Sequence, residues 1–313
     1  MTDATTPHTY HNDLSVDFCG IRLRNPVVTA SGTVGFGRVY NEFFKPSDVG
    51  AVTVKGLTLL PQQGNEPPRI AETPSGMLNS IGLQNPGVDA FLGRELRRLK
   101  SYGAVVIANV AGHTIDEYCE VAQRISHSET DMVELNISCP NVDCGGMAFG
   151  TDPAMAGRVT SAVRARCAKP LIVKLSPNVT DIAEIARAAQ AAGADAISLI
   201  NTLQGMAIDI RTRRPVLRRN VGGLSGPAVK PVAVRMVWEV RRATDLPIIG
   251  MGGVASAEDA LEFILAGASC VGVGAALFNE PRTPLTVLEG IDRYMSEYGV
   301  KSVAELVGAV QPW

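Results

Sequence analysis

The sequence lacks a strong excess of charge and lacks an apolar run long enough to cross a membrane. Its formal net charge is −2 over 313 residues, whereas nucleic acids and anionic membrane surfaces are bound through concentrated positive charge. A membrane-spanning helix needs about 20 consecutive apolar residues. Residues 1–13 contain no lysine or arginine and lead into no apolar segment. We therefore expect no secretory signal, no membrane anchor and no nucleic-acid or membrane partner.

Paired cysteines and metal-ligand spacings are missing as well. The six cysteines form no regular framework, and a chain of this length does not need disulfides, so a cytoplasmic location is expected. Cys139 and Cys144 have the spacing of a plant-type iron–sulfur motif, but Met147 stands where the third cysteine is required. The four histidines have no metal-ligand spacing and suggest no Ser-His-Asp triad. No metal is predicted on this chain.

Aromatic residues are scarce, at 5%, whereas hydrophobic residues make up 46% and glycines number 31. This composition suits a core of valine, isoleucine, alanine and leucine joined by tight turns. Eight short apolar runs alternate with amphipathic stretches, which predicts an α/β fold, a single (β/α)8 barrel with loop insertions at the C-terminal face of the strands. The runs are 26–30, 51–54, 104–108, 132–135, 171–173, 196–200, 247–249 and 270–273.

Two of the amphipathic stretches carry signals for the ends of helices. Residues 181–192 follow Thr180, the predicted N-cap, and residues 256–266 begin at Ser256 and stop before Gly267. Two longer insertions interrupt the alternation. The glycine-rich segment 139–151 is either a mobile lid or a plain surface loop. The segment 204–226 contains five arginines and is predicted to be a solvated face, with partner docking as the alternative.

Polar residues and glycines lie at or just after the ends of the eight runs. In a barrel of this kind the C-terminal ends of the strands carry the chemistry. Any one of these residues alone could face water, but packing gives no reason for so many lysines and asparagines there. The set consists of Ser31, Lys55, Asn109, Asn136, Lys174, Asn201, Gly252 and Gly274.

The glycine pairs after the seventh and eighth runs predict a phosphate site. Backbone N–H groups of such loops hold phosphate in barrel enzymes, although Gly-x-Gly alone often marks only a turn. A phosphate with lysines and amides favours flavin mononucleotide, FMN. Lys174 would then lie at the pyrimidine edge of the flavin and Lys55 between cofactor and substrate. The alternative is a lyase in which Lys174 or Lys55 forms a Schiff base.

Cys139 lies between two amides, Asn136 and Asn141, directly after the fourth apolar run. A thiol acts as a base or nucleophile once its pKa falls from the free value of about 8.5. The amides offer the donors and acceptors that a flat polar ring requires. Cys139 is therefore the candidate reactive group beside a small polar ring.

With these residues the chain resembles the dihydroorotate dehydrogenases, in particular the class 1B catalytic subunits of bacteria. The resemblance covers roughly residues 14–279 and is most specific at 54–56, 79–85, 134–141, 201–203 and 222–227. It implies oxidation of (S)-dihydroorotate to orotate in de novo pyrimidine (UMP) biosynthesis, with Cys139 as the catalytic base. We expect a flexible N-terminal tail over residues 1–13 and one FMN-binding catalytic barrel over residues 14–313.

The resemblance also implies the ligand contacts. An amide-rich pocket can pair with the N–H and C=O groups of dihydroorotate while Lys55 offsets its carboxylate. The residues implied for dihydroorotate are Lys55, Asn79, Ser80, Ile81, Gly82, Leu83, Asn136, Asn201 and Thr202. Those implied for FMN are Ser31, Lys55, Gly56, Asn109, Asn136, Lys174, Ile200, Gly226, Gly252, Gly253, Gly274 and Ala275.

The class within the family determines the electron acceptor. Class 1A enzymes, which use fumarate, also have the cysteine, but the motifs at 145–150 and 205–209 resemble class 1B and imply NAD⁺. The sequence offers no convincing site for nicotinamide, FAD or an iron–sulfur cluster. The resemblance therefore implies a partner subunit carrying FAD and [2Fe–2S], with a homodimer of this chain inside a heterotetramer. The alternatives are a class 1A-like enzyme, a dihydropyrimidine dehydrogenase-like flavoenzyme, the Schiff-base lyase and a barrel that only binds ligands.

Overall fold

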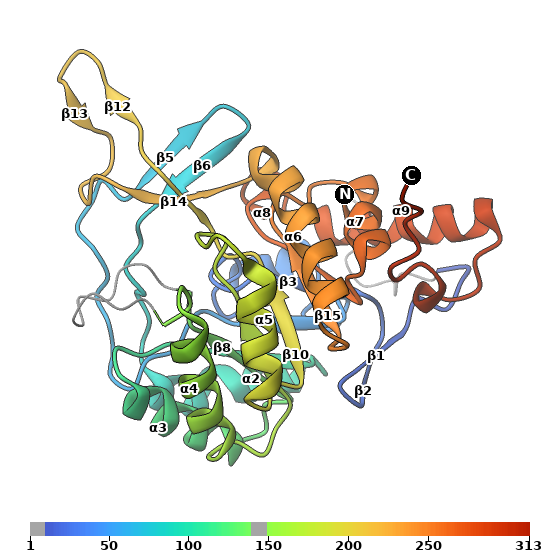
Figure 1. Ribbon diagram of the computed structural model, residues 1–313, viewed down its shortest axis with the longest axis horizontal. Coiled ribbons are helices and arrows are strands. Elements are labelled where there is room, and N and C mark those ends of the chain that lie inside the picture. The colour runs from blue at the N-terminus through green and yellow to red at the C-terminus, as the bar shows by residue number, and fades with distance from the viewer. Residues whose placement is uncertain (1–9, 139–148) are drawn as a thin grey trace.

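Eight parallel strands close into a barrel in the computed structural model, which describes residues 10–138 and 149–313 (Figure 1). Each apolar run forms one barrel strand, so the predicted (β/α)8 barrel is confirmed. The strands are buried along their length because helices cover their outer faces. In chain order they are β3 (Val27–Thr29), β4 (Ala51–Thr53), β7 (Val106–Val110), β8 (Met132–Asn136), β9 (Leu171–Lys174), β10 (Ala196–Leu199), β15 (Ile248–Met251) and β16 (Cys270–Val273).

The covering helices are amphipathic. In α3 the buried residues Tyr118, Val121, Ala122 and Ile125 recur at helical spacing and face the barrel. A π-helical stretch (Phe91–Glu95) joins α1 to α2, and 3₁₀ turns occur at Val39–Glu42, Pro227–Val229 and Val303–Glu305. The α-helices are α1 (Val88–Ala90), α2 (Leu96–Ser101), α3 (Ile115–Ser126), α4 (Pro153–Arg164), α5 (Ile182–Ala191), α6 (Lys230–Ala243), α7 (Ala257–Ala266), α8 (Ala276–Asn279) and α9 (Thr283–Tyr298).

The two predicted helix starts had different outcomes. Ser256 caps α7 as expected, in a capping box with Asp259, and Gly267 ends the helix at a φ of 127°. The prediction that Thr180 is the N-cap of the helix over 181–192 is wrong. Asp181 caps α5 instead, since its carboxylate accepts hydrogen bonds from the backbone N–H groups of Ala183 and Glu184 at 2.8 and 3.1 Å.

A hairpin closes the end of the barrel where the strands begin. It is formed by β1 (Val16–Phe18) and β2 (Ile21–Leu23). Phe18 and Leu23 are both 0% exposed, and they share a core cluster with the first residues of several strands, including Ala51 and Met132. Large apolar side chains therefore fill this end.

A second group of antiparallel strands lies at the other end of the barrel (Figure 1). It comprises β5 (Ile70–Thr73), β6 (Gly76–Asn79), β11 (Leu203–Gly205) and β14 (Gly222–Ser225), in the order β11-β14-β6-β5. Between β11 and β14 the chain forms a projecting hairpin of β12 (Ile208–Asp209) and β13 (Arg214–Pro215). The five arginines of this segment are exposed, which confirms the predicted solvated face.

The first described residues are bound to the last long helix. The backbone N–H groups of His11 and Asn12 donate to the Asp292 carboxylate in α9 at 3.0 and 2.9 Å, and Asn12 Nδ2 donates to it at 2.7 Å. This contact joins the first described residues to a helix near the other end of the sequence, 280 positions later. None of the helices in the described ranges has the length and apolarity needed to cross a membrane.

Candidate active site

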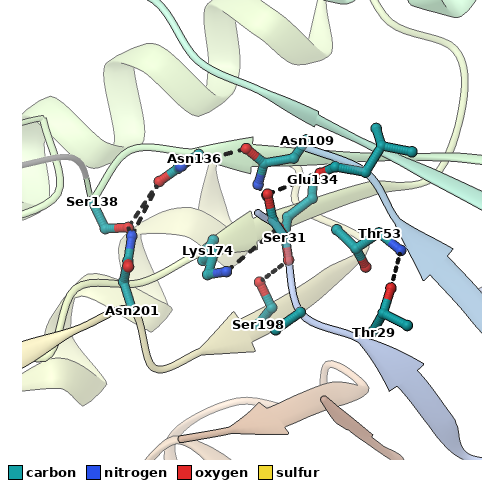
Figure 2. Close-up of polar contacts among 12 residues, drawn as sticks. Thr29, Ser31, Thr53, Asn109, Glu134, Asn136, Ser138, Lys174, Ser198 and Asn201 are labelled. Atoms are coloured by element: carbon teal, nitrogen blue, oxygen red, sulfur yellow. Dashed lines mark hydrogen bonds and ion pairs between the residues drawn. The ribbon is translucent and has the colours of Figure 1, made fainter. Parts of the chain in front are cut away.

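Strand register brings the predicted polar residues together at the end of the barrel where the strands finish (Figure 2). Asn136 and Lys174, the last residues of β8 and β9, are direct partners in the parallel ladder. Asn109 lies within β7, one position short of its end, and is the ladder partner of Glu134. Neighbouring residues in register point to the same side of the sheet, so these side chains meet inside the barrel.

The amides form a continuous network. Asn136 Nδ2 donates to Asn109 Oδ1 at 3.4 Å, while Asn201 Nδ2 donates to Asn136 Oδ1 at 3.4 Å. Ser138 connects the same two residues, donating to Asn136 Oδ1 at 2.9 Å and accepting from Asn201 Nδ2 at 2.5 Å. The Tyr118 hydroxyl in α3 donates to the backbone carbonyl of Asn136 at 2.8 Å. Asn109, Asn136 and Asn201, which the sequence analysis assigned to ligands, therefore lie in one connected set.

Lys55, Ser31 and Gly56 lie on the adjacent strand ends. The Ser31 hydroxyl donates to the backbone carbonyl of Val54 at 2.8 Å. Lys55 Nζ lies beside Gly32, where an added Cβ atom would be 3.4 Å away. An added Cβ at Gly56 would come within 2.9 Å of Asn109 Oδ1, so this position must be small to leave the amide in place.

The segment from Asn79 to Leu83 runs along the second sheet toward these strand ends. A Cβ added at Gly56 would be 3.5 Å from Leu83 Cδ2, which places Leu83 beside the barrel residues. Gly82 and Leu83 have positive φ angles of 73° and 53°. Ser80 is 2% exposed, and its hydroxyl has no hydrogen-bond partner within the described residues. Ile81, the next residue and also predicted to contact the substrate, is half-buried.

Strand β14 joins the two segments that were predicted to bind substrate. Its residue Gly223 pairs with Asn79 of β6 on one side and with Gln204 of β11 on the other. Asn79 Nδ2 donates to the Gly223 carbonyl at 3.4 Å, and Thr202 packs against the Gly223 backbone. Asn79 and Thr202, far apart in the sequence, thus flank one residue.

The glycines predicted to hold phosphate also gather at this end of the barrel. Gly226, Gly252 and Gly253 have φ angles of 104°, 125° and 93°, a region that favours glycine. An added Cβ at Gly253 would lie 2.9 Å from the Gly226 carbonyl oxygen, and one at Gly252 would lie 3.0 Å from Ile200 Cγ1. Gly274 follows β16 directly, and Ala275 comes next, before α8.

The predicted catalytic base, Cys139, lies outside the described residues, as does most of the predicted lid at 139–151. Three thiols of the described residues, Cys19, Cys119 and Cys270, are poor bases near neutral pH. Burial, with repulsion from Asp195, raises the pKa of Cys19 to about 12, and burial also raises the pKa of Cys119 and Cys270. Among the described residues, no group of three or more histidine, cysteine or acidic side chains could hold a metal ion.

One central residue, Glu134, was not among the predicted site residues. It interrupts the apolar run of β8 and is 0% exposed. Ser198 in β10, which donates to it at 2.9 Å, was also missed. An ionisable residue inside an apolar strand is the signal that could have identified Glu134, because a buried carboxylate needs partners.

The residues present fit a phosphorylated flavin. Buried amides and the ammonium of the buried residue Lys174 offer donors and acceptors suited to the edge of a flat ring. The unpartnered Ser80 hydroxyl adds one buried polar atom in the neighbouring segment 79–83, which would contact the substrate beside the flavin. When bound, FMN would supply the capacity to accept a hydride.

Comparison with known proteins gives one family. The model of the dihydroorotate dehydrogenase family matches residues 13–295. A protein of Alkaliphilus oremlandii described as "Dihydroorotate dehydrogenase B (NAD(+)), catalytic subunit" is 56% identical over 296 residues, 95% of this chain and 98% of that protein. One of the same description from Thermoanaerobacter pseudethanolicus is 50% identical over 299 residues, 96% of this chain and 99% of that protein.

A solved structure shows the same fold at lower identity. The crystal structure of DHODH from Eimeria tenella in complex with ferulenol superimposes with a TM-score of 0.81 at 23% identity, covering 97% of this chain and 91% of that one. At this identity the likeness concerns the fold alone. The match to the family model and the near full-length relatives together establish that the chain belongs to the dihydroorotate dehydrogenase family.

Proposed function

We propose that this chain oxidises (S)-dihydroorotate to orotate in pyrimidine biosynthesis, as the FMN-containing catalytic subunit of an NAD⁺-linked enzyme. The observation that carries the proposal is the convergence of Asn109, Asn136, Asn201 and Lys174 at the end of the barrel where the strands finish. Family membership supports the same reaction. The names of the relatives support the NAD⁺-linked class over a fumarate-linked enzyme.

The residues divide into two proposed groups. Asn136, Asn201, Thr202 and Lys55, with residues 79–83, would bind the substrate ring and its carboxylate. The FMN group would be Ser31, Lys55, Gly56, Asn109, Asn136, Lys174, Ile200, Gly226, Gly252, Gly253, Gly274 and Ala275. The close approach of Gly253 to Gly226 and of Gly252 to Ile200 supports a shared site for this second group.

Cys139 is the proposed base. Its thiolate would take the proton from C5 of dihydroorotate while the hydride leaves C6 for the cofactor, so that a C5–C6 double bond forms. The raised pKa values of Cys19, Cys119 and Cys270 support this assignment, because those thiols stay protonated near neutral pH. Ser138, next in the chain, belongs to the amide network and would anchor the approach to Cys139.

A partner subunit follows from the description of the relatives as catalytic subunits. We propose that it carries FAD and a [2Fe–2S] cluster and passes electrons to NAD⁺. A dimer of this chain within a heterotetramer and a cytoplasmic location complete the proposal. If the purified chain alone reduced NAD⁺ as fast as the assembled complex, the partner would be unnecessary.

An anaerobic titration tests the reaction. Dihydroorotate added to the FMN-loaded protein is expected to bleach the flavin band at about 450 nm, and Cys139→Ser should bleach at least about tenfold more slowly at neutral pH while keeping FMN, since a serine hydroxyl is a far weaker acid. Dihydrouracil, which lacks the carboxylate, is the matched control. Bleaching by dihydrouracil alone would indicate a dihydropyrimidine dehydrogenase-like enzyme, and a colourless protein trapped by borohydride would indicate a Schiff-base lyase.

A further inference from the structure

One acidic side chain, Glu134, lies inside the barrel among the groups of the proposed cofactor site. It precedes Asn136 by two residues in β8, so both side chains point to the same face of the strand. The Glu134 side chain is 0% exposed. A carboxylate in such a place is strongly unfavourable unless its oxygens are paired.

Both oxygens of Glu134 have partners on other strands (Figure 2). Oε1 accepts a hydrogen bond from Asn109 Nδ2 at 2.5 Å and lies 3.7 Å from Lys174 Nζ. Oε2 accepts a hydrogen bond from the Ser198 hydroxyl at 2.9 Å. The carboxylate therefore connects β8 with β7, β9 and β10.

The contact with Asn109 determines how that amide is oriented. Since Nδ2 donates to Glu134, Oδ1 is directed toward Asn136 Nδ2 and the backbone at Gly56. Without a hydrogen-bond acceptor at position 134, the Asn109 Nδ2 would lose its partner and the amide would no longer be held in this orientation. The rest of the amide network follows from Asn109, because Asn136 in turn accepts from Asn201.

The contact with Lys174 supplies a counter-charge. The Lys174 side chain is 7% exposed, and a buried ammonium without an anion nearby tends to lose its proton or move toward water. At 3.7 Å the pair is longer than a direct hydrogen bond. The geometry thus leaves N–H donors of the ammonium available for another acceptor.

We propose that Glu134 is a positioning residue for the FMN site, which holds the Lys174 ammonium and orients the Asn109 amide. The inference rests on the proposed function, since Lys174 and Asn109 belong to the proposed FMN group. Glu134 acts through these two neighbours, and Ser198 holds its second oxygen. Its role is therefore tested by cofactor binding, independently of turnover.

The experiment measures FMN binding to apo-protein by quenching of flavin fluorescence in a double-mutant cycle. Glu134→Gln keeps the shape and an oxygen for Asn109 but removes the charge, and we expect the FMN dissociation constant to rise about tenfold. Lys174→Met should also weaken binding. Because Glu134 acts largely through Lys174, adding Glu134→Gln to Lys174→Met should change the constant less than twofold.

Ser198→Ala is the second variant, since it removes only one hydroxyl and is expected to fold. It should weaken FMN binding about twofold to threefold in the wild-type background and leave Lys174→Met unchanged. Thermal unfolding of each apo-variant checks that the proteins are folded. Thr53→Ser is the matched control in the barrel wall, because the Thr53 backbone N–H donates to the Thr29 hydroxyl at 3.1 Å and Thr53 has no contact with Glu134 in the hydrogen-bond network.

The outcomes separate this inference from the proposed reaction. Unchanged or tighter FMN binding by Glu134→Gln, or effects that multiply with Lys174→Met, would overturn the role of Glu134 even if dihydroorotate bleaches the wild-type flavin. If FMN binding followed the expected double-mutant cycle but dihydroorotate did not bleach the wild-type flavin, the positioning role of Glu134 would be supported and the proposed reaction contradicted. A wild-type chain that binds no FMN would overturn both.

Discussion

Asp181 shows how much one side chain contributes at the start of a helix. Its carboxylate satisfies two backbone N–H groups of α5 that would otherwise have no partner. Asp181→Ala should lower the free energy of unfolding by about 1 kcal/mol. Thr180→Ala is the matched control and should change it by less than about 0.5 kcal/mol. Urea unfolding of both variants measures the difference, and an equal effect at the two positions would contradict the assignment of the cap.

Residue identity at strand ends was predictable, whereas residue partnership was not. Asn136, Lys174 and Asn201 could be selected because polar groups end apolar runs. The cap at Asp181 and the contacts of Glu134 depend on which acceptor reaches which donor in three dimensions. Neighbouring residues such as Thr180 and Asp181 are both acceptable N-caps by type, so the sequence alone did not distinguish them.

At the scale of elements, α9 fixes the first described residues to the barrel. Burial alone would raise the pKa of Asp292, but hydrogen bonds from His11 and Asn12 hold it below its ordinary value. Such a carboxylate stabilises the folded state above the unfolded pKa of about 3.9, and its contribution is lost as the pH falls through the lower folded value.

Asp292→Asn is therefore expected to destabilise the protein by about 1.5–3 kcal/mol near pH 7. The difference from wild type should begin to shrink below about pH 4, where the carboxyl becomes neutral in the unfolded chain, and should be lost once the pH falls below the lower pKa of the folded state. Asp13→Asn is the control, because the Asp13 side chain is 66% exposed and its ion pair with Arg22 lies at the surface. Thermal unfolding over a pH series measures both variants; a loss that is independent of pH would contradict the role given to the charge.

The elements that escaped prediction are the short antiparallel strands. β1, β2 and β11 have three residues each, too few for a periodic pattern to stand out. β14 is glycine-rich and pairs with a strand more than 140 positions earlier, as the contact between Asn79 and Gly223 shows. Pairing over such a separation is set by the barrel that carries both segments. The loop prediction at 204–226 therefore captured its exposure but not its strands.

At the scale of the whole molecule, the barrel could be predicted because all eight strands are buried on both faces. Parallel strands of this kind are continuous apolar runs, and the helices between them restore the alternation. The hairpin β1–β2, which closes the end of the barrel where the strands begin, has no comparable pattern in the sequence. Its side chains Phe18 and Leu23 are nevertheless as buried as any strand residue.

Phe18→Ala should therefore lower the free energy of unfolding of the barrel by about 3–5 kcal/mol, since it leaves a cavity among the first residues of the strands. Phe278→Ala, at a phenylalanine that is 52% exposed, should cost about 1 kcal/mol or less. Chemical unfolding of the two variants gives the comparison. Similar losses would indicate that the hairpin packs loosely and contributes little to the core.

Phe18 and Leu23 fill the end of the barrel where the strands begin, and this also determines how ligands can reach the interior. Because packed side chains close that end, ligands would reach the proposed site from the opposite end of the barrel, where Asn136 and Lys174 lie. Orotate that remains bound there would prevent dihydroorotate from binding. Product should accordingly compete with substrate for entry, and release should pace turnover when product accumulates.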